Sequence, residues 1–500
     1  MKLTASDIFT LYRPTLCPLR VYLREQRIPE AEPSAFEQIL QTLGQRHEQE
    51  HLATLGAYED LSAVPPDQRL EGTTSAIRNR VAVIYQGEFA REVKLGGVSV
   101  TIVGRPDFLI LDGDGYLIRD SKLSRKVDEE HHTEISLQLQ LYGWMFEQTV
   151  GIPAKRLQVH TGKGDIVDVP YDGGVAVLAE LTRILTTKRL GAEPYEPLGW
   201  TKCSGGCGYN DRCWQQAEAR QDVSLVMEVD QGLARKLHAD GIVSAQQLLS
   251  SFDAQHLSEL KRPWGPKQQK VGTKAEKILL FAEVLCSGKE RILGPAIIPV
   301  HDNYVMFDLE GMPPYLDELE QIYLWGMKVY GKCPSAFTGL TAGFGTNGDR
   351  DGWMAFLSGA KKLFDDYGDI PFVHWHHYEK THIKQYIERY GDPDGIAARV
   401  LTNLLDLLPI TKSAIAIPRP SYSLKVVEEY VGFKRTQDEY GGSWAMAQLI
   451  LATETEDEGE RNFRMDEILK YNEEDLAATW AVFEWLRNKP TAAQISAGKR

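Results

Sequence analysis

Two carboxylates and a lysine lie close together between residues 104 and 122. The stretch Gly104-Arg105-Pro106-Asp107 is expected to end one strand, and Asp120-Ser121-Lys122 is expected to end the neighbouring strand of a hairpin. Carboxylate oxygens are the ligands that Mg²⁺ and Mn²⁺ prefer, and a lysine beside them can orient or deprotonate an attacking water and offset phosphate charge. The pattern predicts metal-assisted phosphodiester hydrolysis. Alone, it also fits a solvated hairpin with surface charges.

Three residues outside this stretch strengthen the prediction. His47 lies in an expected helix upstream, and downstream Gln138 and Tyr142 are four residues apart, on one face of a helix. In this order the residues resemble the RecB-type branch of the PD-(D/E)XK nucleases, whose pattern is a helix histidine, GxxD, (D/E)xK and QxxxY. The resemblance implies that His47, Asp107 and Asp120 bind Mg²⁺ or Mn²⁺. It also implies that Gln138 and Tyr142 support the site or the DNA backbone.

Four of the six cysteines form a second constellation. Cys203, Cys207 and Cys213 are clustered, and Cys17 lies before the nuclease motifs. Three thiolates are one short of a closed metal site, and Cys17 would complete it if the two segments meet. One cysteine before the core and three after it resemble the iron–sulfur variety of RecB-type nuclease, which implies a [4Fe–4S] cluster. Zinc on the same four thiolates stays the alternative.

A second set of acids lies in the C-terminal part. Asp308 and Glu310 end an apolar strand, where alternation places them on one face. Tyr471 and Asp475 are four apart on an expected helix. Carboxylates that hold two metals suit in-line phosphodiester hydrolysis.

These acids resemble the DEDDy exonucleases, the DnaQ-like group on an RNase H-like fold. Asp308 and Glu310 match its DxE motif, and Tyr471 and Asp475 match YxxxD. Its middle motif usually reads HNxxFD, whereas here Glu379 stands where the aspartate is expected. The resemblance implies that Tyr471 positions the water and that Asp308, Glu310, Glu379 and Asp475 bind metal. A zinc site at His374, His376 and His377 is disfavoured because no fourth ligand is in sight.

The elements that must position these residues can be predicted from the pattern. Residues 34–56 and 134–151 are typical of helices, and residues 98–123 of successive strands with a turn at Asp112-Gly113-Asp114-Gly115. Residues 225–290 are predicted to be helical. Within them, residues 233–250 resemble a helix-hairpin-helix, which offers backbone N–H groups to phosphate; a plain helical spacer is the alternative. Strands and helices alternate after about residue 295.

Composition sets the outer limits. The chain has 500 residues, 43% hydrophobic and 25% charged, which suggests several globular domains. No apolar run is long enough for a membrane span, and the N-terminus does not resemble a signal peptide, so we expect a cytoplasmic protein. The net charge of −14 argues against a basic coat that binds nucleic acid non-specifically, but it does not exclude a nuclease built on carboxylates.

The sequence therefore predicts an α/β multidomain protein. Residues 1–220 are expected to form a PD-(D/E)XK restriction-endonuclease-like α/β/α core with the four-cysteine site. Residues 221–294 form a helix-hairpin-helix-like middle, residues 295–490 an RNase H-like α/β domain, and residues 491–500 a flexible tail.

The expected function is a metal-dependent DNA exonuclease on single strands or frayed ends, in repair, recombination or defence against phage and mobile elements. The sequence has no Walker A motif, so an unwinding helicase would be a separate partner. The alternatives are a non-catalytic DNA-binding or scaffold subunit of a helicase–nuclease complex, and a nuclease directed at RNA.

Overall fold

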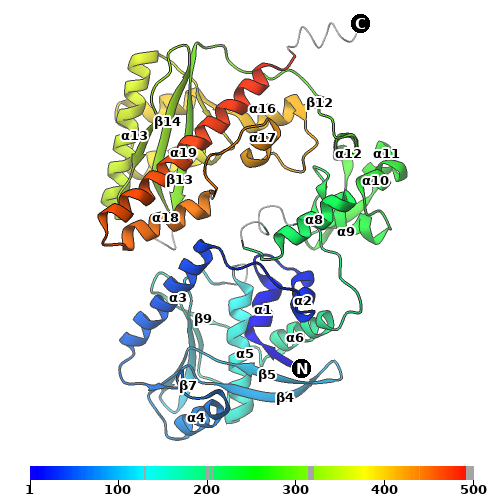
Figure 1. Ribbon diagram of the computed structural model, residues 1–500. Coiled ribbons are helices and arrows are strands. Elements are labelled where there is room, and N and C mark those ends of the chain that lie inside the picture. Colours follow the sequence, from blue (N-terminus) through cyan, green and yellow to red (C-terminus); the bar gives the residue numbers. More distant parts are fainter. Residues whose placement is uncertain (129–130, 199–202, 204–205, 313–319, 439, 491–500) are drawn as a thin grey trace. The chain divides into compact units, whose positions relative to one another are not determined.

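The computed structural model divides the chain into two compact units, Met1–Trp214 and Gln215–Arg500 (Figure 1). The structure describes residues 1–128, 131–198, 203, 206–312, 320–438 and 440–490. The predicted flexible tail, 491–500, lies outside these residues, and the three-domain division with boundaries at 220 and 294 stays a prediction. In the part of the chain that is described, no helix combines the length and apolarity that a bilayer crossing requires.

The first unit is built on two sheets. The larger has the order β2-β3-β6-β7-β8-β9 and the smaller the order β1-β5-β4. Their strands are β1 (Lys2–Thr4), β2 (Glu59–Asp60), β3 (Val83–Tyr85), β4 (Phe89–Leu95), β5 (Val98–Gly104), β6 (Phe108–Asp112), β7 (Gly115–Ser121), β8 (Leu157–His160) and β9 (Ile166–Val169). The predicted turn joins β6 to β7, where Asp112 pairs with Gly115.

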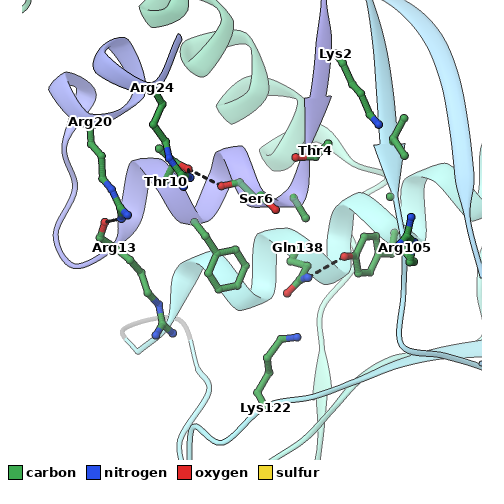
Figure 2. Close-up of a pocket in the computed structure, with 15 residues that line it drawn as sticks. Lys2, Thr4, Ser6, Thr10, Arg13, Arg20, Arg24, Arg105, Lys122 and Gln138 are labelled. Carbon is green, nitrogen blue, oxygen red and sulfur yellow. Dashed lines mark hydrogen bonds between the residues drawn. The ribbon is translucent and has the colours of Figure 1, made fainter. Parts of the chain in front are cut away.

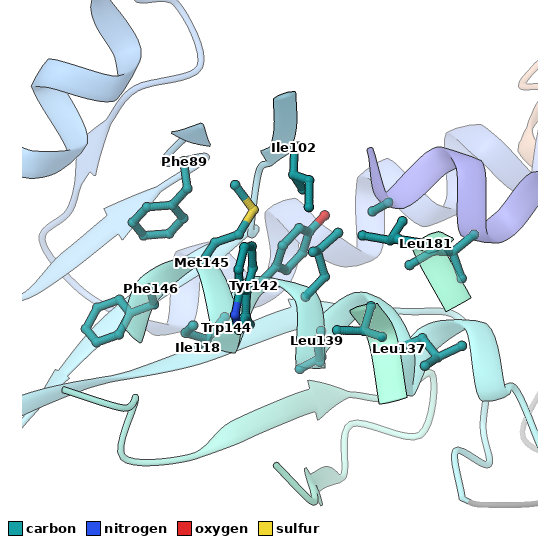
Figure 3. Packing of buried hydrophobic residues seen from close by; sticks show 14 of the residues in the cluster. Phe89, Ile102, Ile118, Leu137, Leu139, Tyr142, Trp144, Met145, Phe146 and Leu181 are labelled. Carbon is teal, nitrogen blue, oxygen red and sulfur yellow. The ribbon is translucent and has the colours of Figure 1, made fainter. Parts of the chain in front are cut away.

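Helices cover these sheets. They are α1 (Ala5–Tyr12), α2 (Pro18–Glu25), α3 (Ala35–Thr54), α4 (Pro66–Arg78), α5 (Thr133–Val150) and α6 (Val175–Lys188). A further helix, α8 (Asn210–Arg220), includes the boundary between the two units. Ser34 caps α3 by accepting a hydrogen bond from the Glu37 amide, as a capping box requires. The helices predicted at 34–56 and 134–151 are thus confirmed as α3 and α5. Helix α5 is buried on most of its surface, and its side chains pack with those of β4, β5, β7 and α6 in one hydrophobic core (Figure 3).

The strands predicted within residues 98–123 are confirmed, but the predicted place of Asp107 among them is wrong. Asp107 does not end β5. The strand β5 stops at Gly104 and belongs to the smaller sheet, whereas Asp107 immediately precedes β6 in the larger one. Because β6 and β7 are antiparallel and Phe108 pairs with Arg119, the start of β6 lies beside the end of β7. This register, rather than two adjacent strand ends, brings Asp107 to Asp120.

The second unit has a five-stranded sheet of order β15-β14-β13-β16-β17, in which β13 is antiparallel to β14 and parallel to β16. The strands are β13 (Asn303–Met312), β14 (Gln321–Gly331), β15 (Thr338–Thr341), β16 (Phe372–His374) and β17 (Leu404–Asp406). The helices after residue 303 are α13 (Gly345–Tyr367), α14 (Tyr378–Tyr390), α15 (Ile396–Asn403), α16 (Leu407–Ala414), α17 (Leu424–Tyr430), α18 (Gly442–Glu454) and α19 (Glu458–Arg487). A two-residue strand β18 (Ile415–Ala416) pairs with β12 (Arg291–Ile292).

Strand β13 separates two cores. Its odd-numbered residues, such as Phe307, pack with α13, α14 and α15. Its even-numbered residues Tyr304 and Met306 pack in another cluster with Phe483 and other residues of α19. Figure 1 shows α19 running along β13 and β14. Asp308 and Glu310 continue the even-numbered series, so they face α19, which carries Tyr471 and Asp475.

The middle segment contains α9 (Gln231–Ala239), α10 (Ala245–Ser251), α11 (Ala254–Glu259) and α12 (Ala275–Ser287). The prediction that residues 225–290 are all helical is wrong at β10 (Lys261–Trp264) and β11 (Lys267–Lys270), which form an antiparallel hairpin. Pro263 disfavours a helix there, and Gly265 adopts a positive φ of 56° in the turn. The buried cluster of this segment also includes residues of β13, β16 and α19.

The hairpin between α9 and α10 keeps its own amides occupied. The N–H groups of Val243 and Ser244 both donate to the Gln247 side chain, and Ser244 caps α10. Phosphate binding by this hairpin stays a prediction.

Candidate active sites

The structure brings Asp107, Asp120 and Lys122 together in the first unit. The backbone N–H of Asp107 donates to Asp120 Oδ1 at 3.0 Å, and the N–H of Ser121 donates to Asp107 Oδ2 at 2.9 Å. Lys122 Nζ lies 3.0 Å from Asp120 Oδ2 and 3.9 Å from Asp107 Oδ2. Each carboxylate is thus fixed by the backbone next to the other, and the lysine joins both.

Burial dominates the electrostatics of this group. Asp107 is 8% exposed and Asp120 is fully buried. Removal from water and the charge of Asp120 raise the pKa of Asp107 well above its usual range, against the lowering influence of Lys122. Burial lowers the pKa of Lys122, but the two carboxylates outweigh it and raise that pKa overall. The lysine is therefore charged at neutral pH, and a second cation would relieve the repulsion between the acids.

Glu48 is a third carboxylate at this site, which the sequence analysis passed over in favour of its neighbour His47. Gln86 Nε2 donates to Glu48 Oε1 at 2.7 Å and to Asp107 Oδ1 at 3.2 Å, which joins the two acids. The Tyr85 hydroxyl also donates to Glu48 Oε1, at 2.7 Å. The usable signal was that Glu48 follows His47 directly on the same helix.

His47 has other contacts. Its ring stacks on that of His160 at 4.5 Å, and its Nε2 lies 3.5 Å from the His160 carbonyl oxygen. His160 in turn stacks on His51 at 3.8 Å. A metal-binding role for His47 stays a prediction.

Gln138 and Tyr142 form a pair on α5, as their spacing predicts. Gln138 Nε2 donates to the Tyr142 hydroxyl at 2.8 Å, and Gln138 Oε1 is buried without a partner among the described residues. Gly104 lies against this pair, since a Cβ at that position would be 2.9 Å from Tyr142 Cδ1 and 2.8 Å from Met145 Sδ. The close packing of strand and helix explains the glycine of the GxxD motif.

Cys17 and the later cysteines meet, as the predicted fourth ligand required. Cys17, Cys203, Cys207 and Cys213 all line one small pocket, together with Tyr209. Cys17 directly precedes α2, and Cys213 lies on α8. Burial raises the pKa of Cys17 to about 12 and that of Cys213 to about 11, so without a cation these thiols stay protonated. Soft thiolate ligands fit iron or zinc.

Three acids gather in the second unit. Ligand atoms of Asp308, Glu310 and Asp475 all lie within 4.8 Å of one another, in a group that could hold a metal ion. Glu310 and Asp475 are each 7% exposed. Burial and mutual repulsion raise the pKa values of Asp308 and Glu310 well above their usual range, and three oxygen ligands at this spacing fit Mg²⁺ or Mn²⁺.

Residues of α19 surround this cluster. Asn472 Nδ2 donates to Asp308 Oδ2 at 2.7 Å. A Cβ on Gly326 would be 1.7 Å from Asn472 Oδ1, so the glycine leaves room for this side chain. Tyr471 is 4% exposed, and burial together with the charges of Glu310 and Asp475 raises its pKa. Tyr471 therefore stays protonated and can donate a hydrogen bond. The role of Tyr471 in positioning a water stays a prediction.

Arg435 enters the cluster from the loop after α17. It donates to Asp475 Oδ1 and makes a two-pronged pair with Glu428 at 2.7 and 2.8 Å. The side chain is 4% exposed. No motif in the sequence pointed to Arg435, which lies 40 residues before Asp475.

Glu379 is not a member of the three-acid group. Its Oε2 lies 2.9 Å from His374 Nδ1, and both side chains are almost fully buried. Burial raises its pKa, against the lowering influence of His374. His376 donates its backbone N–H to Asp406 Oδ1 at 2.9 Å. Three of the four predicted carboxylates therefore lie together. The metal-binding role of the fourth, Glu379, stays a prediction.

Comparison with known proteins gives two family matches. Residues 10–214 match the model of the PD-(D/E)XK nuclease superfamily, and residues 305–487 match a model of the RNase_H superfamily. These superfamilies are phosphodiesterase nucleases that use divalent metals, so the matches support a nuclease function that acts on nucleic acid. No curated protein matches the chain. A solved structure titled "Crystal structure of SSO0001" is similar at 21% identity over 42% of this chain and 85% of that chain, with a TM-score of 0.22.

Proposed function

We propose that this chain, which carries a PD-(D/E)XK nuclease domain and an RNase H superfamily domain, is a metal-dependent DNA exonuclease. It would act on single strands or frayed ends. The observation that carries the proposal is the convergence of Asp107, Asp120 and Lys122, held by backbone hydrogen bonds across β6 and β7. A RecB-type site of this kind needs these three groups at one point.

In the first domain, Asp107 and Asp120 would hold Mg²⁺ or Mn²⁺, with Glu48 or His47 completing the ligand set. The cation would supply Lewis acidity and a lower pKa for a bound water. Lys122, charged and directed at both acids, orients the attacking water and offsets the charge of the phosphate. Gln138 and Tyr142 contact the DNA backbone or fix the site from α5.

In the second domain, Asp308, Glu310 and Asp475 would hold the cation, and Tyr471 would orient the water through its hydroxyl. Glu379 would take part only if it leaves His374. A DEDDy-type exonuclease site is thus supported by three of its four acids.

The four cysteines would hold a [4Fe–4S] cluster, with Zn²⁺ as the alternative. The support is that Cys17 lines the same pocket as Cys203, Cys207 and Cys213, although about 190 residues separate it from them in sequence. Such a centre would link the residue before α2, Cys17, to α8 and the segment that precedes it.

The biological setting we propose is DNA repair, recombination or defence against phage and mobile elements, in the cytoplasm. A separate helicase would open duplex ends.

A non-catalytic DNA-binding or scaffold subunit is the second candidate, and a specific observation favours it for the C-terminal domain. Arg435 already neutralises Asp475, and Glu379 is held by His374, so a fixed guanidinium supplies a counter-charge where a cation would bind.

The test is release of labelled nucleotides from single-stranded DNA by the purified chain. Release in Mg²⁺ or Mn²⁺ that EDTA abolishes is the expected result. Tight DNA binding with no release in either metal would favour the scaffold candidate, and release from RNA alone would favour an RNA-directed nuclease.

A further inference from the structure

We infer that the pocket beside Lys122 binds the phosphate backbone of a single nucleic-acid strand and leads it to the PD-(D/E)XK site. The inference rests on the proposed nuclease function for the identity of its ligand. The pocket has a volume of about 580 Å³ and lies between β1, α1, α2, β5 and α5. Lys122, Gln138 and Tyr142 form part of its wall, so it is continuous with the proposed active site.

Charge identifies the ligand class. The pocket is lined by six basic side chains and by no acidic one: Lys2, Arg13, Arg20, Arg24, Arg105 and Lys122. The whole chain, by contrast, has a net charge of −14. Figure 2 shows Arg13, Arg20 and Arg24 on one side, Lys2 and Arg105 on the other, and Gln138 and Lys122 between them. A concentration of positive charge on one concave surface of an acidic protein indicates a polyanionic ligand.

The arginines are held in place by acids that do not line the pocket. Arg24 Nη2 lies 2.9 Å from Glu30 Oε2, Arg13 Nη2 lies 2.6 Å from Glu134 Oε1, and Arg105 Nη2 lies 2.7 Å from Glu88 Oε2. A guanidinium has five N–H donors, and one carboxylate occupies at most two. The acids therefore orient the guanidinium groups and leave N–H groups for phosphate oxygens, which arginine binds well.

The volume of the pocket suits part of a single strand. About 580 Å³ is within the range of small-ligand sites, roughly 300–1,000 Å³, which suits one or two nucleotides. Phe9 also lines the pocket, with the Arg13 guanidinium 5.6 Å from its ring. An aromatic ring among cations is the usual arrangement for binding single strands without sequence preference.

The experiment measures equilibrium binding by fluorescence anisotropy, with Ca²⁺ in place of the catalytic metals, as a function of salt. The ligands are a labelled single-stranded DNA, the same sequence as RNA, and a blunt DNA duplex. Arg24→Gln with Arg105→Gln removes two pocket charges. Arg91→Gln with Lys94→Gln, on exposed residues of β4 outside the pocket, is the matched control.

Each phosphate contact on a single strand contributes about 0.7 to the slope of log K against log [salt], so loss of two contacts should lower it by about 1.4. We expect this loss for the pocket variant only, and tighter binding of strands, DNA or RNA, than of the duplex. An equal loss in both variants, no loss in the pocket variant, or equal affinity for the duplex would overturn the inference. Pocket-dependent binding by a wild type that cleaves nothing in Mn²⁺ would instead reject the proposed function and leave this inference standing.

Discussion

Arg435 donates a hydrogen bond to Asp475, one of the three acids that gather in the second unit. The guanidinium is almost fully buried and also holds Glu428 through two hydrogen bonds. A positive charge fixed beside Asp475 lowers the negative potential that attracts a divalent cation. Two arrangements of Asp475 are therefore in competition, one with Arg435 and one with metal.

Removing this competitor should strengthen metal binding. Arg435→Gln combined with Glu428→Gln deletes the buried charge pair without leaving either member alone. We expect Mn²⁺ affinity at the acidic cluster to rise about tenfold, equivalent to about 1.4 kcal/mol, as measured by calorimetric titration of a protein that also carries Asp120→Asn. Arg464→Gln with Glu460→Gln, a pair elsewhere on α19, is the control. Unchanged or weaker binding would mean that Arg435 supports the metal site and does not compete.

The acidic cluster should also be a source of instability without metal. The Glu310 side chain is buried and has no hydrogen bond or ion pair within the described part of the chain. Burial and the charge of Asp475 raise its pKa, against the lowering influence of Lys425. A carboxyl group whose pKa is raised in the folded state stabilises the fold below its ordinary pKa, and that stabilisation is lost as pH rises toward the raised pKa. At neutral pH the group therefore lowers the free energy of unfolding.

We therefore expect Glu310→Gln to raise the melting temperature in EDTA, through a gain on the order of 1 kcal/mol in the free energy of unfolding. The variant should also show a smaller further increase in melting temperature with Mn²⁺ than the wild type does. Differential scanning calorimetry measures both. Glu429→Gln, at an exposed position on α17, should change neither. A lower melting temperature for Glu310→Gln in EDTA would contradict the proposed repulsion.

The histidine stack predicts a pH dependence of stability. Burial, with the nearby charges of His160, Arg119 and His47, lowers the pKa of His51 from 6.5 to about 4. A depressed pKa means that stability is full above pH 6.5 and is lost as pH falls toward 4. For a shift of this size the loss between pH 7 and pH 5 is about 2 kcal/mol. Urea unfolding at the two pH values should show this loss in the wild type and a smaller one in His51→Gln. An equal loss in both would rule out His51 as its source.

The cysteine pocket predicts a coloured protein whose cofactor depends on Cys17. Anaerobically purified wild type should show a broad band near ~400 nm if the thiolates hold iron, and Cys17→Ser should lose most of it, whereas Cys286→Ser should not. Arg20, on the helix that Cys17 precedes, lines both the cysteine pocket and the basic pocket. Cys17→Ser should therefore also weaken single-strand binding. Colourless protein with one zinc per chain would reject the iron–sulfur cluster and retain the four-cysteine site.

Local patterns were enough to predict much of the fold. The helix at residues 34–56, the turn at Asp112 to Gly115 and the alternation along β13 each depend on near neighbours in sequence, and each is present in the structure. The assignment of Asp107 to the end of β5 was wrong because sheet membership depends on long-range pairing. The β10–β11 hairpin was missed although its signals, Pro263 and Gly265, are local.

The candidate sites show the same division. Asp107, Asp120 and Lys122 were found because their motif is compact. Glu48 is linked to Asp107 through Gln86, and all three residues are distant from one another in sequence. Arg435 could not be predicted, because its partner Asp475 is 40 residues distant. A contact between charged residues that are distant in sequence depends on the tertiary fold, so no local pattern predicts it.

Lys122 is predicted to serve a working nuclease site in the first unit. The direct measurement is degradation of single-stranded DNA labelled at its 5′ or 3′ end, in Mg²⁺ and Mn²⁺, by wild type, Lys122→Ala and Asp308→Ala. We predict that Lys122→Ala lowers one end-specific activity at least about 100-fold while the protein still binds DNA. If Asp308→Ala removes an activity of its own, the second domain is catalytic too. Undiminished degradation by Lys122→Ala would mean that the site formed by Asp107, Asp120 and Lys122 does not cleave DNA.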